Sequence, residues 1–245
     1  MSGLAKLCCF LVCAVAIGCT SDPVDPPQTS VNVDGYAVTS FEGSWDSLRT
    51  ATSTVTKYIG GPGDGKYSLA LPFDFPYDGD TIAANTLISV GANGAISLYD
   101  SSIPPRQLVG DSSYPGIIAP FNGELKQGND KKAGVEDTLG LYSVTGTAPS
   151  RVLTIEYRAF HLKGGGNQGG LVDTLTSMQV KLYETTGVIE FIYRDNGLDL
   201  PTKWEHRMCV GLNGLSTSAF KSKAHVKDTK IIPATDIRWT PGRLQ

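Results

Sequence analysis

Glu156 and Glu190 are the residues of this chain best suited to acid–base chemistry, because each lies in a run with the polar–apolar alternation of a strand. A glycoside hydrolase needs two carboxyl groups about 5 to 10 Å apart across the sugar. Neighbouring strands would give that spacing. Arg158 and Lys181 fall on the same outward faces, however, and ion pairing at the surface is the simpler role for all four residues.

Other catalytic signatures are missing from the sequence. It contains no Gly-x-Ser-x-Gly motif and no phosphate-binding loop. His161, His206 and His225 are scattered, and none has the spacing to a second His or Cys that a metal site needs. Cys209 lies in the apolar run 208–212, which predicts a buried thiol rather than a nucleophile. We therefore expect a protein that is not an enzyme and that needs no cofactor.

Calcium is the one metal that the side chains could suit. Asp195, Asn196 and Asp199 place three oxygen-bearing side chains on one loop, and a second group of acids lies between residues 74 and 80. Calcium prefers such hard oxygen ligands. The same residue types are also common in turns, and a turn is the favoured interpretation of both segments.

Aromatic side chains could bind a sugar if they are exposed, since a ring offers a flat surface to the apolar face of a pyranose. Trp204, in a proline-containing loop, is the first candidate, and Tyr99 is the second. Trp45 belongs to the same group of rings. Trp239 lies between Arg238 and Thr240 in a strand-like run, which predicts a core position.

Strands must position these residues, because the sequence shows no helical periodicity after residue 17. Asn93-Gly94 predicts a two-residue hairpin turn, and Asn213-Gly214 predicts another turn. Residues 117–121 read as a strand whose proline, Pro120, favours a strand end or a sheet edge.

The run of residues 178–193 predicts a hairpin with a defined register. A turn at residues 184–187 that pairs Leu182 with Ile189 also places Lys181 opposite Glu190, and a shift by one residue would set Leu182 against Glu190. About ten short strands at such intervals predict an all-β fold, a single antiparallel two-sheet β-sandwich of jelly-roll-like form.

The N-terminus predicts export. Lys6 precedes the apolar run 7–17, which is too short to span a bilayer, and small Gly18 comes before Cys19. This order resembles a bacterial lipoprotein signal, although Ala16 and Ile17 depart from the usual pattern. The resemblance implies that residues 1–18 are removed and that Cys19 carries the lipid. An ordinary signal peptide, with no lipid on Cys19, is the alternative.

The remaining chain divides into a lipid anchor with a proline-rich linker, residues 19–32, and a β-sandwich domain, residues 33–245. The full chain has 21 Lys and Arg against 24 Asp and Glu, and loss of the one lysine in the signal leaves 20 against 24, a net charge of −4. That mild acidity gives no electrostatic surface for nucleic acid. The expected partners are the membrane, through the N-terminal lipid, and a glycan or protein ligand.

Five segments together resemble the β-sandwich modules of secreted and cell-surface proteins of Bacteroidota and related bacteria, which often accompany type IX secretion sorting domains. These segments span residues 69–98, 117–125, 146–160, 179–193 and 209–214, and the hairpin QVKLYETTGVIEFIY at 179–193 is the most specific. The resemblance implies a non-catalytic module. The lipoprotein-type start departs from that family, so type IX export is not carried over.

These observations predict a non-catalytic, lipid-anchored protein of the cell envelope. We expect it on the bacterial outer membrane, either periplasmic or surface-exposed, with a binding or structural β-sandwich. A carbohydrate-binding surface lipoprotein and an envelope glycoside hydrolase are the alternatives.

Overall fold

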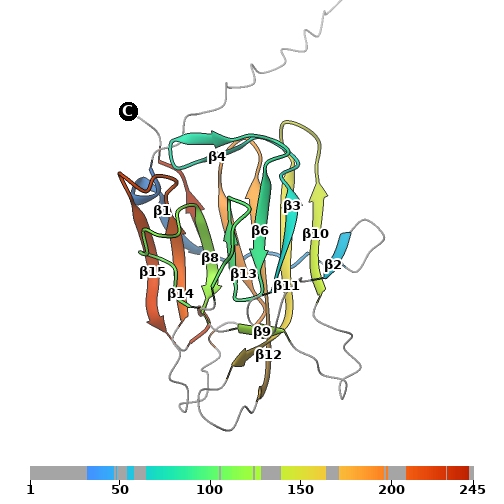
Figure 1. The fold of residues 1–245 in the computed structure, drawn as a ribbon. Helices are drawn as coiled ribbons and strands as arrows, with labels where there is room; N and C mark the ends of the chain where they lie inside the picture. The colour runs from blue at the N-terminus through green and yellow to red at the C-terminus, as the bar shows by residue number, and fades with distance from the viewer. Residues whose placement is uncertain are drawn as a thin grey trace, which may run out of the picture.

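Two antiparallel sheets face each other in the computed structural model of this chain (Figure 1). The structure describes residues 32–46, 48, 54–57, 65–104, 106–123, 125–127, 139–163, 171–195, 197, 208–229 and 231–242. Among these residues, no helix has the length and hydrophobicity needed to cross a membrane. The helical element found there is the short 3-10 turn η1 (Val33–Gly35).

The larger sheet contains eight strands. In spatial order they are β1 (Ala37–Phe41), β16 (Asp236–Thr240), β13 (Ile189–Tyr193), β12 (Leu171–Tyr183), β11 (Val152–Lys163), β10 (Leu139–Thr145) and β2 (Thr54–Lys57), with β9 (Leu125–Gln127) paired to β11.

The second sheet contains six strands, and a small hairpin lies beside it. The six strands are, in spatial order, β15 (Ser222–Thr229), β14 (Met208–Asn213), β8 (Ile117–Asn122), β7 (Ala95–Ser97), β6 (Leu87–Gly91) and β3 (Lys66–Ala70), and the hairpin is formed by β4 (Phe75–Tyr77) and β5 (Asp80–Ile82). The predicted two-sheet β-sandwich is confirmed. The described residues hold sixteen strands rather than about ten, because several strands have only three to five residues.

Alternate side chains of the two sheets form one core. Leu153, Ile155 and Tyr157 of β11 point inward, as their period of two predicts, and Trp239 of β16 is fully buried in the same core. The hairpin of β12 and β13 has the predicted register, with Leu182 opposite Ile189. A one-residue slip would turn these apolar side chains out of the core, which is why the sequence pattern specified the pairing.

Both Asn-Gly turns differ from the prediction. Gly91 pairs with Ala95, so the β6–β7 turn has three residues, and Gly94 carries the positive φ of 79° that favours glycine. Asn213 is not in a turn at all, since it ends β14 and pairs with Ser222. Both asparagines are fully buried.

Buried asparagines hold a long loop, residues 99–116, across the outer face of the six-stranded sheet. The Asn93 Nδ2 donates to the carbonyls of Ile103 and Pro104 at 2.7 and 2.6 Å. The Asn213 Nδ2 donates to two further loop carbonyls, both at 2.8 Å, and its Oδ1 accepts from Gly110 N at 2.9 Å. Beneath the loop lies a second apolar cluster, which contains Ala95, Ile103, Leu108, Val109, Ile117, Ala119 and Cys209.

The prediction that Pro120 lies near a strand end or a sheet edge is wrong. Its strand, β8, lies in the middle of the six-stranded sheet, between β14 and β7. The register of β8 with β14 shifts between Ala119 and Asn122, so two residues of β8 lie opposite one of β14. Pro120 lies within this bulge, where its missing N–H interrupts no regular ladder.

Candidate functional site

Polar side chains are buried on the outer face of the eight-stranded sheet. They are at most 6% exposed, and the row consists of Thr154, Glu156, Gln179, Lys181, Glu190 and Asp236. Residues of these types are rarely buried unless they are hydrogen-bonded or paired. The segment of residues 42–46, which follows β1 and which we call the strap, supplies many of their partners.

Gln179 of β12 binds the strap backbone in both directions. The Asp46 N–H donates to Gln179 Oε1 at 3.1 Å, and Gln179 Nε2 donates to the Asp46 carbonyl at 2.6 Å. The same Nε2 also donates to Glu156 Oε2 at 2.8 Å. The amide therefore joins the strap to two strands of the sheet.

Lys181, two residues further along β12, binds the strap at two more points. Its ammonium donates to the Ser44 carbonyl at 2.8 Å and pairs with Asp46 Oδ2 at 2.9 Å. Trp45 lies between these two residues, so the backbone on both sides of the tryptophan is fixed to buried side chains of β12. The backbone that carries the Trp45 ring is thereby fixed to the sheet.

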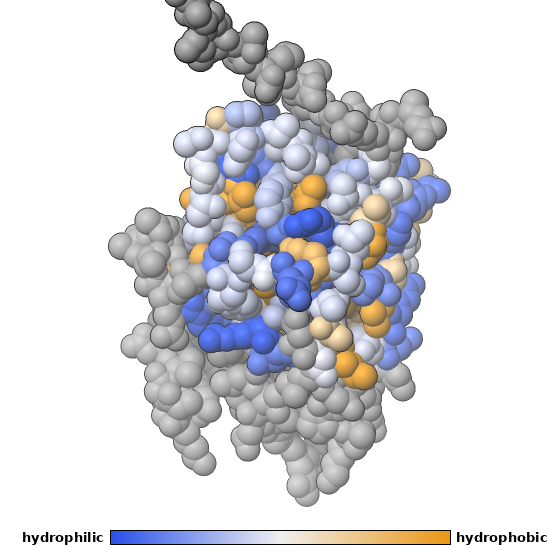
Figure 2. All heavy atoms as spheres, turned by 180° about the vertical axis from the view of Figure 1, so that it is seen from behind, coloured by the Kyte–Doolittle hydropathy of each residue, from blue (hydrophilic) through white to orange (hydrophobic). Residues whose placement is uncertain are grey.

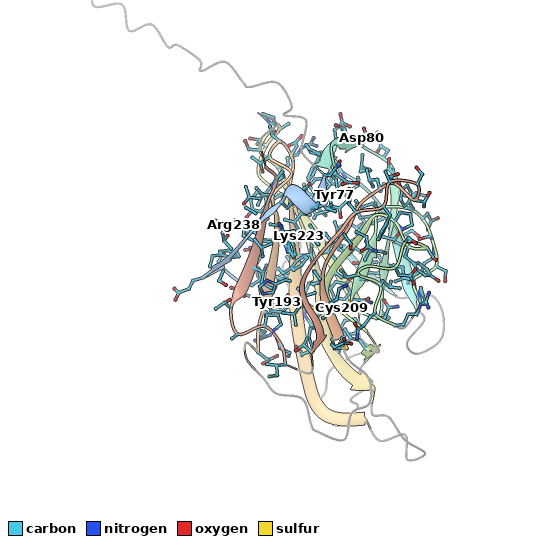
Figure 3. All side chains as sticks on the ribbon, turned by 90° about the vertical axis from the view of Figure 1, so that its left-hand side faces the viewer. Tyr77, Asp80, Tyr193, Cys209, Lys223 and Arg238 are labelled. Carbon is cyan, nitrogen blue, oxygen red and sulfur yellow. The ribbon has the colours of Figure 1, made fainter. Side chains whose placement is uncertain are left out.

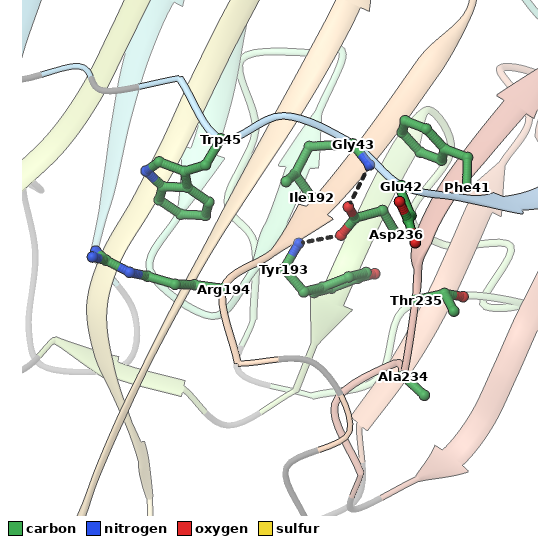
Figure 4. Close-up of a pocket in the computed structure, with 10 residues that line it drawn as sticks. All are labelled: Phe41, Glu42, Gly43, Trp45, Ile192, Tyr193, Arg194, Ala234, Thr235 and Asp236. Atoms are coloured by element: carbon green, nitrogen blue, oxygen red, sulfur yellow. Dashed lines mark hydrogen bonds between the residues drawn. The ribbon is translucent and has the colours of Figure 1, made fainter.

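Gly43 forms another contact between the strap and the sheet. Its N–H donates to Asp236 Oδ2 at 2.8 Å, while Asp236 Oδ1 accepts from Tyr193 N at 2.9 Å (Figure 4). A Cβ added at Gly43 would lie 2.4 Å from Ile192 Cδ1 and 2.9 Å from Asp236 Oδ2. A side chain at this position would force Ile192, Asp236 or the strap itself to shift.

A pocket of about 630 Å³ opens between the strap and the sheet, in the usual size range of small-ligand sites. Trp45 and Phe41 contribute to its walls together with Tyr193, whose hydroxyl reaches through the core to the Pro120 carbonyl, and the Arg194 guanidinium lies over the Trp45 ring, 5.6 Å from its centroid. Figure 4 shows these groups around one hollow, whose full lining is Phe41, Glu42, Gly43, Trp45, Ile192, Tyr193, Arg194, Ala234, Thr235 and Asp236.

The surface around this region mixes hydrophilic and hydrophobic residues and gathers neither kind into one broad patch (Figure 2). Phe41, beside the pocket, packs under the Arg238 guanidinium, which lies 4.3 Å from its ring centroid. Such stacking covers aromatic surface while the charge stays at the water boundary.

Glu156 and Glu190 do not face solvent as predicted, because the strap and neighbouring side chains cover them. They are 1% and 4% exposed, and their strands, β11 and β13, are separated by β12. Glu156 pairs with Arg158, as expected, and with Gln179. Lys181 lies opposite Glu190 in the register but pairs with Asp46.

Fixed donors hold both oxygens of Glu190. The Tyr183 hydroxyl donates to Oε2 at 2.8 Å, and Arg238 Nε donates to Oε1 at 2.8 Å. Burial raises the pKa of Tyr183, and its hydrogen bond to Glu190 raises it further. The tyrosine therefore remains a donor across the physiological range.

Tyr99 lies away from this pocket, just after β7 on the six-stranded sheet. It is 41% exposed, and its hydroxyl donates to the Leu215 carbonyl at 3.3 Å. Partial burial raises the pKa of Tyr99, and the nearby carboxylates of Asp78 and Asp80 add to this effect. The structure thus does not bring Tyr99 together with the rings of the pocket.

Several predicted site residues lie outside the described part of the chain. These are Cys19, Trp204, Asn196 and Asp199, so the lipidation site, the first aromatic candidate and most of the predicted calcium loop stay predictions. Asp195 is described and follows Arg194. Within the described residues, no group of three His, Cys, Asp or Glu side chains could hold a metal ion.

The acids between residues 74 and 80 bind backbone groups at turns. Asp78 accepts from Val33 N at 2.8 Å and from Leu215 N at 2.6 Å, which ties η1 and the segment after β14 to the β4–β5 turn. Asp74 accepts from Ala84 N at 2.7 Å. The turn interpretation of this segment is confirmed.

Cys209 is buried in β14, as predicted, on the side of the sheet that the loop 99–116 covers. Figure 3 shows it toward the end of the molecule opposite Tyr77 and Asp80. Burial raises the pKa of the Cys209 thiol, which keeps it protonated. A role as a nucleophile has no support from this environment.

The strap and its pocket were not predicted from the sequence. Residues 42–46, Glu-Gly-Ser-Trp-Asp, show no periodicity and resemble an ordinary loop. A tryptophan in a short polar segment was the available signal, because a large ring in a loop either packs on another element or is open to a ligand.

One family model matches the chain: a family described as NIDO related, over residues 35–241, a range that includes both sheets and the strap. No curated protein and no solved structure matches the chain.

Proposed function

The chain belongs to the NIDO-related family, and from this premise we propose that it is a non-catalytic binding or structural module of the cell exterior, held at the outer membrane by a lipid on Cys19. Family membership suggests an extracellular binding or structural role. The lipid anchor and the outer-membrane address come from the N-terminal sequence.

One observation carries the proposal: two of the buried charged residues on the outer sheet face, Lys181 and Asp236, hold the strap. Lys181 binds Ser44 and Asp46, and Asp236 binds the Gly43 N–H. A buried ionic network costs desolvation, and its best-attested use is to fix one geometry. Here that geometry is the position of Trp45 beside an open pocket, which is the arrangement of a binding site.

The state of the carboxyl groups favours binding over catalysis. A retaining or inverting glycosidase needs one carboxyl free to give a proton and another free to act on the sugar or on water. Glu156 and Glu190 each have both oxygens engaged by fixed donors. Neither lines the pocket.

Metabolic labelling with palmitate tests the anchor. We expect label on the wild type and on Cys209→Ala, and none on Cys19→Ala. The Cys209 variant is the matched control, because it removes a buried cysteine and leaves the signal intact. Equal labelling of the wild type and Cys19→Ala would contradict lipid anchoring.

A screen of polysaccharides for released reducing sugar tests the proposal that the module is non-catalytic. We expect no release by the wild type. Release that is lost in Glu156→Gln or Glu190→Gln would overturn the non-catalytic assignment and would favour an envelope glycoside hydrolase.

A further inference from the structure

Trp45 is presented by a rigid piece of backbone. Ser44 before it and Asp46 after it are both held by side chains of β12, and Gly43 is held by Asp236. A ring that is ordered in the free protein loses little conformational entropy when a ligand packs on it. A fixed backbone at Trp45 lowers the entropy cost of ligand binding, which is an advantage for a binding site.

The pocket carries charges of both signs. Arg194 brings one positive charge over the Trp45 ring, and Glu42 brings one exposed carboxylate. The Asp236 carboxylate is committed to two backbone N–H groups. A uronate, a sulfate or a phosphate would gain from Arg194 but would be repelled by the two acids.

A hydroxyl-rich neutral ligand suits this set of groups better. Hydroxyls can donate to Glu42 and accept from Arg194, and Thr235 adds a hydroxyl of its own at the rim. The ring of Trp45 offers apolar surface to the face of a sugar that carries only C–H groups, while the ring of Phe41 is stacked under Arg238. A volume of about 630 Å³ accommodates one or two sugar residues.

We propose that this pocket binds a neutral sugar residue of a glycan chain, with Trp45 as the stacking ring and with Glu42 and Arg194 as hydrogen-bonding partners. The inference rests on the proposed function, since it assigns the ligand class of that binding module. It places the ligand site at the strap rather than at Tyr99.

The test is a glycan array that carries neutral oligosaccharides of hexoses and N-acetylhexosamines alongside uronic-acid, sialylated and sulfated ones, probed with the full-length protein in detergent micelles. We expect binding to neutral glycans. Trp45→Ala should weaken it about tenfold or more, the usual loss when a central aromatic contact is removed.

Tyr114→Ala is the matched control. Tyr114 is also a half-buried ring beneath an arginine, with the Arg106 guanidinium 5.2 Å from its centroid, but it lies on the loop 99–116 over the other sheet. We expect Tyr114→Ala to bind like the wild type. Glu42→Gln, a change at an exposed residue that preserves shape, should weaken neutral binding several-fold and keeps the test valid if Trp45→Ala fails to fold.

Three results would overturn the inference. They are the failure of the folded wild type to bind any glycan, an equal loss in Tyr114→Ala and Trp45→Ala, and binding that is confined to acidic glycans. Each of these leaves the non-catalytic, lipid-anchored assignment intact, because palmitate labelling and sugar release test that assignment separately.

Discussion

Gln179 and Asp46 exchange a pair of hydrogen bonds, from Asp46 N to Gln179 Oε1 at 3.1 Å and from Gln179 Nε2 to the Asp46 carbonyl at 2.6 Å. A side-chain amide thereby provides the donor and the acceptor that a neighbouring strand would otherwise supply. The strap is joined to the sheet by this amide without continuing its ladder.

Gln179→Leu should lower the free energy of unfolding by about 2 kcal/mol, because it leaves the half-buried N–H and carbonyl of Asp46 without their partner and removes a donor from buried Glu156. Urea denaturation followed by tryptophan fluorescence measures this change. Gln107→Leu is the control, since the Gln107 amide donates to Asp228 at the surface and its loss should change stability by less than about 0.5 kcal/mol. Equal effects of the two substitutions would contradict the role given to Gln179.

Asp100 should give the protein a pH-dependent part of its stability. Hydrogen bonds from Lys66, Ser68 and Ser89 lower the pKa of Asp100 from 3.8 to about 2. A depressed carboxyl pKa stabilises the fold above the unfolded value and loses that effect as the pH falls through the folded value. The stabilisation should therefore be complete above about pH 4 and should disappear between about pH 4 and pH 2.

Melting temperatures of the wild type and Asp100→Asn, measured from neutral to acidic pH, check this prediction. We expect the wild type to melt higher at neutral pH and the difference to vanish near pH 2. Lys66→Met removes the donor with the largest effect and should bring the pKa of Asp100, followed by carboxyl NMR, back toward its ordinary value. A constant difference across the pH range would count against the prediction.

Cys209 should be inert to thiol reagents in the folded protein. It is fully buried, and burial raises its pKa, so the reactive thiolate is scarce. Labelling with a maleimide, read by mass spectrometry, should modify Cys209 only after unfolding in urea. Cys209→Ala identifies the modified site, and labelling of the native wild type at the rate of a free thiol would refute the prediction.

Asn213→Ala should loosen the loop 99–116. The substitution removes the partners of the Leu108 and Tyr114 carbonyls and of the Gly110 N–H. We expect a loss of about 3 kcal/mol in unfolding free energy and faster proteolytic cleavage within the loop. Asn85→Gly is the control: Asn85 is exposed with a φ of 66°, a conformation that glycine adopts freely, so its cleavage pattern should match the wild type.

The hairpin of β12 and β13 could be predicted to the residue because its information is local. Alternation places Val180 and Leu182 on one face, and one buried face admits one register. The buried thiol of Cys209 and the core position of Trp239 followed from the same pattern. Burial between two sheets depends mainly on side-chain period, which a sequence displays directly.

The two Asn-Gly pairs show where local information fails. Asn-Gly is a strong turn signal because both residues tolerate positive φ. The side-chain amides of Asn93, within its turn, and of Asn213, at a strand end, bind a loop that lies ten and ninety-nine residues away in the chain. Nothing near these asparagines in the sequence indicates such distant partners.

The outer face of the eight-stranded sheet was mispredicted for a related reason. Glu156, Gln179 and Lys181 have the alternation and polarity of a solvent-facing row, and they occupy the predicted face. They are buried because the strap crosses them from a point more than one hundred residues earlier in the chain. Periodicity assigns a side chain to a face of the sheet, but it does not show what covers that face.

The pairing of β1 with β16 determines when the edge of the eight-stranded sheet can form during synthesis. The first strand of the large sheet lies against the last, with Ala37 opposite Thr240 and Phe41 opposite Asp236. During synthesis, β1 and the strap leave the ribosome before their partners are made. The partner of β1 is β16, and those of the strap are β12 and Asp236. Closure of this sheet edge therefore waits for residues 236–240, and a deletion of β16 leaves β1 without its neighbour and the strap without Asp236.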